Sequence, residues 1–122
     1  MKHSKDANLL GHIIRSCDDV NMALEDYGGS RERFEESPAF RNACAMPLVQ
    51  IGELVKYLSE EALAGMPEIP WRNVKAMRDF FFSGGQHLNV QALWETALED
   101  IPMLRKVCYE YIKTRMNREV NP

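Results

Sequence analysis

The chain has 122 residues, of which 45% are hydrophobic and 27% charged, and this predicts a single folded domain that buries a core without metal or disulfide support. The apolar content excludes disorder over the whole chain, and no uninterrupted apolar run reaches the roughly 18 residues of a membrane span. Fifteen Lys and Arg against eighteen Asp and Glu give a net charge of −3, which argues against non-specific coating of nucleic acid and still allows a local basic patch.

The first predicted element is a helix from about Asp6 to Tyr27, where apolar residues recur mostly at steps of three and four. Gly28-Gly29 should end it, because glycine adopts the left-handed conformation that closes a helix. His12 falls at the flank of the apolar stripe, where we expect a solvated side chain without a chemical role. A short turn over residues 30–36 should follow.

A second helix is predicted to open at Ser37 and Pro38, since serine caps a helix and proline suits its first position. The apolar stripe of this helix continues to Leu58 and is wide, so we expect burial around much of its circumference. Pro47 lies inside the helix and is expected to kink its axis. Residues 59–70 should form a further short turn and a loop.

A third helix is predicted from residue 70 or 71 to about Phe82, where Ser83-Gly84-Gly85 breaks it. Arg72 and Lys75 lie on its polar side. Arg78 lies about 40° from Val74 by the same helical arithmetic, at the edge of the apolar stripe. An arginine at that edge needs an anion or a dimer cleft, or it extends into solvent or pairs with a carboxylate such as Asp79.

Asn89 is predicted to cap a fourth helix that extends to Tyr111. Pro102 is expected to kink this helix. The polar tail over residues 113–122 is expected to fray. Four amphipathic helices with short connections predict an all-α antiparallel bundle of four to five helices. The wide apolar face of the second helix and the three phenylalanines at 80–82 exceed what this bundle needs, which predicts a homodimer.

The cysteines and histidines give no support to a metal or disulfide framework. Cys17, Cys44 and Cys108 are odd in number, widely spaced and on apolar stripes, so we expect buried, unreactive thiols. The three histidines form no metal-binding pair, and no metal or other cofactor is expected. The N-terminus lacks the apolar core of a secretory signal, so the cytoplasm is the expected location, without a membrane partner.

Several short motifs occur together along the chain: Ile51-Gly52-Glu53, Lys56, Leu58-Ser59, Ile69-Pro70-Trp71, Met77-Arg78-Asp79, Asn89, Trp94-Glu95 and Ile101-Pro102 with Leu104. In combination they resemble the HepT-like branch of the HEPN superfamily, over roughly residues 9–112. The resemblance implies one α-helical domain that pairs as a dimer. It also implies the toxin of a prokaryotic toxin–antitoxin pair, whose partner is an MntA-type nucleotidyltransferase, with metal-independent RNA cleavage at the dimer cleft.

The family motif is an arginine, usually followed by a polar residue, then a histidine after a gap of four to six residues in all. A tyrosine commonly follows two residues after the histidine. Arginine can hold the scissile phosphate and offset its developing charge, and histidine can move a proton as the ribose 2′-hydroxyl attacks. In many members the tyrosine is where the nucleotidyltransferase attaches AMP.

The chain departs from this motif at two positions. By the resemblance, Arg78 and Asp79 match, whereas Ser83 stands at the histidine position and Gly85 at the modified tyrosine. The one nearby imidazole, His87, is separated from Arg78 by a longer gap than the family has. Arg72 and Lys75 are then the expected RNA contacts, and Arg78, Asp79 and Ser83 the catalytic positions.

Two functions remain open from the sequence. One is a HepT-like ribonuclease toxin impaired by Ser83, and the other is an inactive module that binds a nucleotidyltransferase and RNA. An unrelated four-helix regulator is a third possibility. Gln50 and Glu53 lie off the apolar stripe and face solvent, a cleft or a partner, whereas the tryptophans are expected to pack in the bundle instead of stacking on bases.

Overall fold

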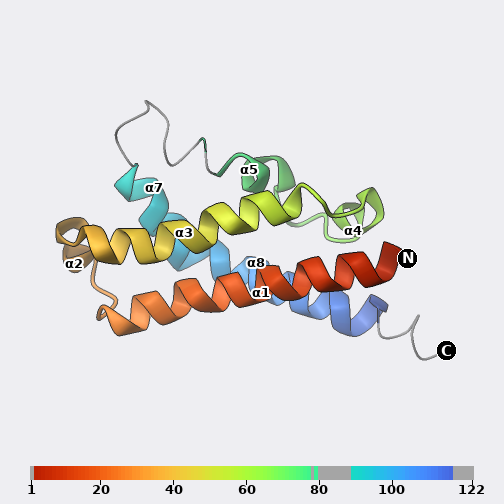
Figure 1. Ribbon diagram of the computed structural model, residues 1–122, viewed down its shortest axis with the longest axis horizontal. Helices are drawn as coiled ribbons and strands as arrows, with labels where there is room; N and C mark the ends of the chain where they lie inside the picture. Colours follow the sequence, from red (N-terminus) through yellow and green to blue (C-terminus); the bar gives the residue numbers. More distant parts are fainter. Residues whose placement is uncertain (1, 78, 80–88, 117–122) are drawn as a thin grey trace.

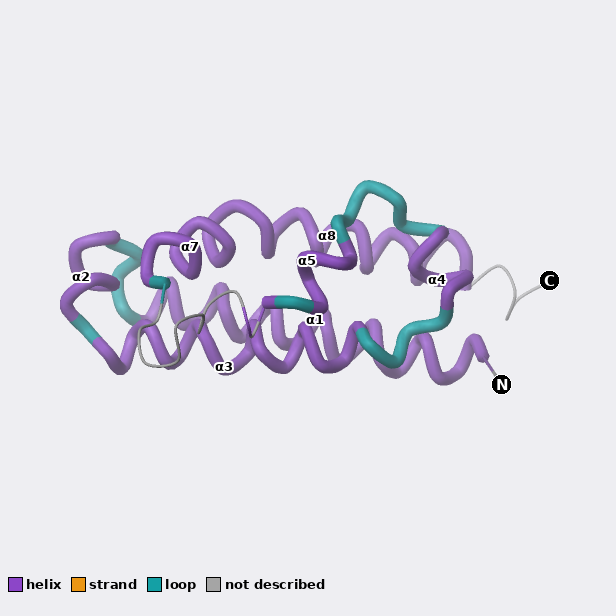
Figure 2. The backbone as a smooth tube through the Cα atoms, turned by 90° about the horizontal axis from the view of Figure 1, so that it is seen from above, coloured by secondary structure: helices purple, strands orange, loops and turns teal. Residues whose placement is uncertain are grey.

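The computed structural model describes residues 2–77, 79 and 89–116. Every element in this part of the chain is helical, which confirms the all-α prediction. Figure 1 shows α1 running antiparallel to α3 and α8, and Figure 2 shows the short loops between the helices. The elements are α1 (Lys2–Asp26), α2 (Arg31–Glu36), α3 (Pro38–Val55), α4 (Glu60–Ala64), α5 (Trp71–Lys75), α7 (Val90–Glu95), the π-helix η1 (Thr96–Asp100), α8 (Ile101–Tyr111) and the π-helix η2 (Ile112–Met116).

The predicted end of the first helix and the predicted start of the helix at Ser37 are largely confirmed. Helix α1 begins four residues earlier than expected and ends at Asp26, where Gly28 and Gly29 take φ values of +86° and +62°. Side chains of Ser30 and Ser37 accept hydrogen bonds from the amides of Arg33 and Phe40, at 3.0 and 3.1 Å. The turn expected at 30–36 is therefore a capped helix, α2.

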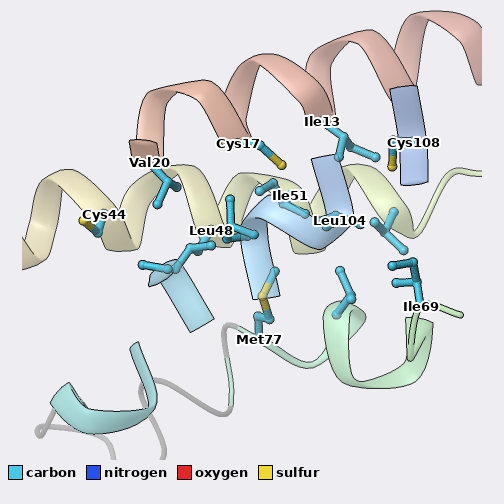
Figure 3. Packing of buried hydrophobic residues seen from close by; sticks show 14 of the residues in the cluster. Ile13, Cys17, Val20, Cys44, Leu48, Ile51, Ile69, Met77, Leu104 and Cys108 are labelled. Carbon is cyan, nitrogen blue, oxygen red and sulfur yellow. The ribbon is translucent and has the colours of Figure 1, made fainter. Parts of the chain in front are cut away.

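Helix α3 forms the centre of the bundle and continues through Pro47 to Val55. It packs against α1 on one side and against α2, α5 and α7 on others. Figure 3 shows Ile13, Cys17 and Val20 pointing from α1 towards α3, and Leu48 and Ile51 within the same core. The buried residues of α3 are Phe40, Cys44, Ala45, Pro47, Leu48, Ile51, Gly52 and Val55, which confirms burial around much of its circumference.

An aromatic cluster fixes one end of the core. The rings of Tyr27 and Phe40 stack with their centroids 4.9 Å apart, and Phe34 meets Phe40 edge-on at the same separation. The ring centroids of Trp94 and Phe34 lie 5.1 Å apart. Outside this cluster, the indole of Trp71 donates a hydrogen bond to the Met66 carbonyl at 3.0 Å. Both tryptophans are buried, so the expectation that they pack in the bundle is confirmed.

Helix α5 is shorter than predicted. It ends at Lys75, and Ala76 leaves the helical region with φ −91° and ψ 5° while its amide is shared between the carbonyls of Arg72 and Asn73. Met77 is buried after this turn. The interruption at Ala76 was not predicted, and Met77 and Asp79 again have helical backbone. Arg78 and the predicted helix end near residue 82 lie outside the described residues.

The chain accommodates Pro102 with a wide turn. Asn89 caps α7 by accepting from the Ala92 amide at 3.1 Å, as predicted. Before the proline, the chain widens into η1, and the amide of Ile101 bonds to the Thr96 carbonyl five residues back. Proline lacks an amide donor and its ring crowds the carbonyl four residues earlier, so a π turn relieves the contact without ending the helix.

A buried carboxylate joins the two ends of the first half of the chain. Asp6 of α1 is 3% exposed and accepts from both the amide and the hydroxyl of Ser59, at 3.0 and 2.6 Å. Ser59 in turn caps α4 through the Ala62 amide at 3.1 Å. Figures 1 and 2 both show α4 beside the start of α1. This contact fixes the turn between α3 and α4.

No helix in the described ranges combines the length and the apolar character that crossing a membrane requires.

We predict that Asp6→Ala lowers the free energy of unfolding by about 1–3 kcal/mol, because it leaves the half-buried amide and hydroxyl donors of Ser59 without their acceptor. Asp6→Asn, which retains one acceptor oxygen, should cost less. Denaturant unfolding followed by circular dichroism measures both. Asp19→Ala, at an exposed position of the same helix, is the control and should stay within about 0.5 kcal/mol of the parent. An equal effect of the Asp6 and Asp19 changes would contradict the role of the buried contact.

The thiols behave as predicted in being buried, at 0–1% exposure for Cys17, Cys44 and Cys108. Burial raises the pKa of Cys17 and of Cys108 to about 12 and that of Cys44 to about 11. The unfolded thiols lose their protons near the ordinary value of 9.0, before the folded ones do. The thiols therefore lower the unfolding free energy as pH rises above roughly 9.

We predict that a thiol-specific reagent at pH 8 labels no cysteine in the native protein and labels all three in denaturant. The native thiols are shielded and protonated, whereas the unfolded ones are exposed and partly ionised. Absorbance of the released chromophore measures the reaction. Native labelling at the rate of a free cysteine would show that at least one thiol is accessible.

Candidate nucleic-acid interface

The structure places some of the predicted site residues and not others. Arg72 and Lys75 are exposed on α5, and Asp79 is exposed shortly beyond the turn at Ala76. The remaining motif positions, Arg78, Ser83, Gly85 and the more distant His87, lie outside the described residues.

Arg72, Lys75 and Asp79 come together along one shallow groove of about 420 Å³. Lys56, the residue that follows α3, lines the same groove together with Ala76. We call this groove of residues 56, 72, 75, 76 and 79 the basic groove. It carries three cationic side chains against one carboxylate, which suits an anion with spread charge such as the backbone of a nucleic acid.

The basic groove exists because α5 lies unusually close to α3. Gly52 of α3 faces the end of α5, and a Cβ atom there would lie 3.0 Å from the Val74 carbonyl oxygen. The contact is with backbone, which cannot swing aside as a flexible side chain can. Helix α5 buries Trp71 and Val74 on its inner face. Its exposed residues Arg72 and Lys75 therefore point outward beside the end of α3.

Lys56 is the residue of the groove that sequence reasoning missed as a site residue. It appeared only as part of the Gly52-containing motif, because its position beside α5 depends on the packing of helices distant in sequence. Its Nζ atom lies 3.0 Å from Oε1 of Glu53, and both side chains are about half exposed. Exposed pairs of this kind contribute about 0–1 kcal/mol, so a phosphate can replace Glu53 as the partner of Lys56.

Gln50 and Glu53 line a second groove, between α1 and α3. His12 and Arg15 contribute to its other side, and Nδ1 of His12 lies 2.9 Å from Nη2 of Arg15. His12 is exposed, as predicted. The groove mixes cations and carboxylates, and it therefore favours an extended anion less than the basic groove does.

The chemistry available in the basic groove is charge recognition. Arginine can hold phosphate oxygens bidentately and lysine acts as a point charge. Within the part of the chain that is described, no three His, Cys, Asp or Glu residues gather where they could hold a metal ion.

Comparisons with known proteins agree on one family. A sequence model of the family described as "Ribonuclease HepT-like" matches residues 13–111. "Putative RNase TTE0752" of Caldanaerobacter subterraneus subsp. tengcongensis is 32% identical over 85% of this chain and 91% of its own length. "Putative RNase MJ0125" of Methanocaldococcus jannaschii is 30% identical over 83% and 85%. "Probable ribonuclease HepT" of Thermococcus cleftensis is 40% identical over 45% and 50%.

No solved structure matches the chain at a comparable level of significance. The family match covers most of the chain and includes every helix that forms the basic groove. It also excludes the unrelated four-helix regulator that the sequence left open. The chain belongs to the HepT-like ribonuclease family of the HEPN superfamily.

Proposed function

We propose that this single-domain chain is the ribonuclease toxin of a prokaryotic toxin–antitoxin pair, acting as a cytoplasmic homodimer and weakened in cleavage by Ser83. RNA is the proposed substrate and an MntA-type nucleotidyltransferase the proposed partner. The observation that carries the proposal is the basic groove beside Asp79, the sequence neighbour of Arg78, in a chain of the HepT-like family.

The basic groove supports the binding half of this function. Lys56, Arg72 and Lys75 hold the backbone of a strand through its phosphates, without reading the bases. Arg78 directly precedes Asp79 in the sequence, and the proposal brings a strand in this groove to the motif arginine. We assign Arg78 to the scissile phosphate, where it offsets charge on the non-bridging oxygens.

The chemical half requires a proton acceptor for the ribose. In metal-independent cleavage the 2′-oxygen bonds to phosphorus, the bond from phosphorus to the 5′-oxygen breaks, and the leaving oxygen takes up a proton. An imidazole at position 83 would accept and return that proton near neutral pH. The serine hydroxyl at Ser83 does neither at that pH, so we expect weak cleavage.

The second candidate function is a non-catalytic module that keeps the dimer, the nucleotidyltransferase contact and RNA binding. Ser83 and Gly85 favour it, because together they remove both the proton-transfer group and the hydroxyl that would be modified. The two candidates share the basic groove and differ at position 83, where one experiment separates them.

We predict that Ser83→His raises RNA cleavage about 10²–10⁴-fold, the usual contribution of a general acid–base group, and arrests growth of a bacterial host. Gel analysis of a labelled RNA and plating after induced expression measure the two effects. Gly85→Tyr is added if the single change is silent. The control is Arg78→Ala in the Ser83→His background, which should return cleavage to the parental level.

No cleavage and no growth arrest from the Ser83→His, Gly85→Tyr variant would reject the ribonuclease and leave the interaction module.

We predict that Arg72→Ala with Lys75→Ala weakens binding of single-stranded RNA and flattens its salt dependence. Each lost phosphate contact should lower the slope of log affinity against log salt by about 0.7. Fluorescence anisotropy over a salt series measures this. Lys106→Ala with Lys113→Ala, which removes the same charge from exposed positions of α8 and η2, is the matched control. Equal slopes for the two double variants would place the RNA elsewhere.

A further inference from the structure

Tyr57 carries the most exposed aromatic ring among the described residues. It is 61% exposed in the turn between α3 and α4, whereas the other aromatic rings of the described residues are buried or half-buried, apart from Tyr109 at 50%. Of its two neighbours in the sequence, Lys56 lines the basic groove and Leu58 is buried. Tyr57 is therefore adjacent in sequence to a residue of the basic groove.

Hydrogen bonds of the turn order the backbone that carries this exposed ring. The amides of Tyr57 and Leu58 each donate at 3.1 Å, to the carbonyls of Leu54 and Val55. One residue further, Ser59 is tied to the buried carboxylate of Asp6. A ring carried on an ordered backbone loses less conformational freedom when a ligand covers it than a ring on an unsupported loop, which favours its use as a contact surface.

One lysine lies close to the ring in space, and another lies next to Tyr57 in the sequence. Lys5 of α1 places its Nζ atom 6.0 Å from the centre of the Tyr57 ring, and Lys56 precedes the tyrosine directly. Glu60 and Glu61 open α4 and repel phosphate, so a strand that covers Tyr57 should continue towards Arg72 and Lys75 and not along α4. Single strands are commonly held by such a combination of an aromatic face and flanking cations.

We propose that Tyr57 is a stacking platform for one base of a single-stranded RNA whose neighbouring phosphates bind Lys5, Lys56 and the basic groove. This inference rests on the proposed RNA-binding function and extends it from phosphate contacts to a base contact. Since every base offers an aromatic face, Tyr57 contributes affinity and register with little preference for sequence.

The test compares two probes: a 2′-O-methyl oligoadenylate, which cannot be cleaved through its 2′-oxygen, and the same backbone without bases. The parent protein should bind the base-bearing probe more tightly. Tyr57→Ala should weaken that binding about 5- to 150-fold and leave the abasic probe unchanged, because stacking alone is lost. Tyr57→Phe should retain the parental preference, and Tyr109→Ala, at the other exposed tyrosine, should also retain it.

The outcomes separate this inference from the function beneath it. Loss of binding to both probes in the Arg72→Ala, Lys75→Ala variant, with no effect of Tyr57→Ala, overturns the platform and keeps the RNA-binding function. Failure of the parent protein to bind either probe overturns the RNA-binding function itself. A Tyr57→Ala protein that keeps both affinities but changes its mass in analytical ultracentrifugation assigns the ring to a protein interface and also overturns the platform. Circular dichroism confirms that each variant folds.

Discussion

The close contact between α3 and the helices around it is the constraint on which the rest of the molecule depends. Helix α3 is buried on most of its circumference, and α1, α2, α5 and α7 each pack against part of it. Removing apolar surface from water supplies the main favourable free energy of such a bundle. The grooves then form where the outer helices meet α3, so the positions of the charged side chains follow from core packing.

Apolar periodicity and capping chemistry were enough to predict most of the helices. Ser37, Pro38 and Asn89 are local signals whose hydrogen bonds involve only the next turn, and they act in the structure as the sequence indicates. The turn at Ala76 was not predicted, because nothing in Lys75-Ala76-Met77 opposes helix continuation. The tie between Asp6 and Ser59 joins residues 53 positions apart and has no periodic signal.

The residues of the candidate site also fall into those that the sequence predicts and those whose position depends on the fold. Arg72 and Lys75 follow from helical spacing, since both lie on the polar side of one short helix. Lys56 joins them only through the packing of α5 on α3, and Tyr57 becomes informative only once its exposure is known. The motif residues Arg78, Ser83 and Gly85 come from family resemblance, and their assignment stays a prediction.

Gly52 has a consequence for how the basic groove of this chain could change. Because the Val74 carbonyl oxygen lies 3.0 Å from where a Cβ atom of residue 52 would be, any larger residue at Gly52 requires the backbones of α3 and α5 to shift apart. Adaptation to a bulkier or differently spaced polyanion would therefore proceed through the length and charge of the rim residues, while the helical frame beneath them remained the same.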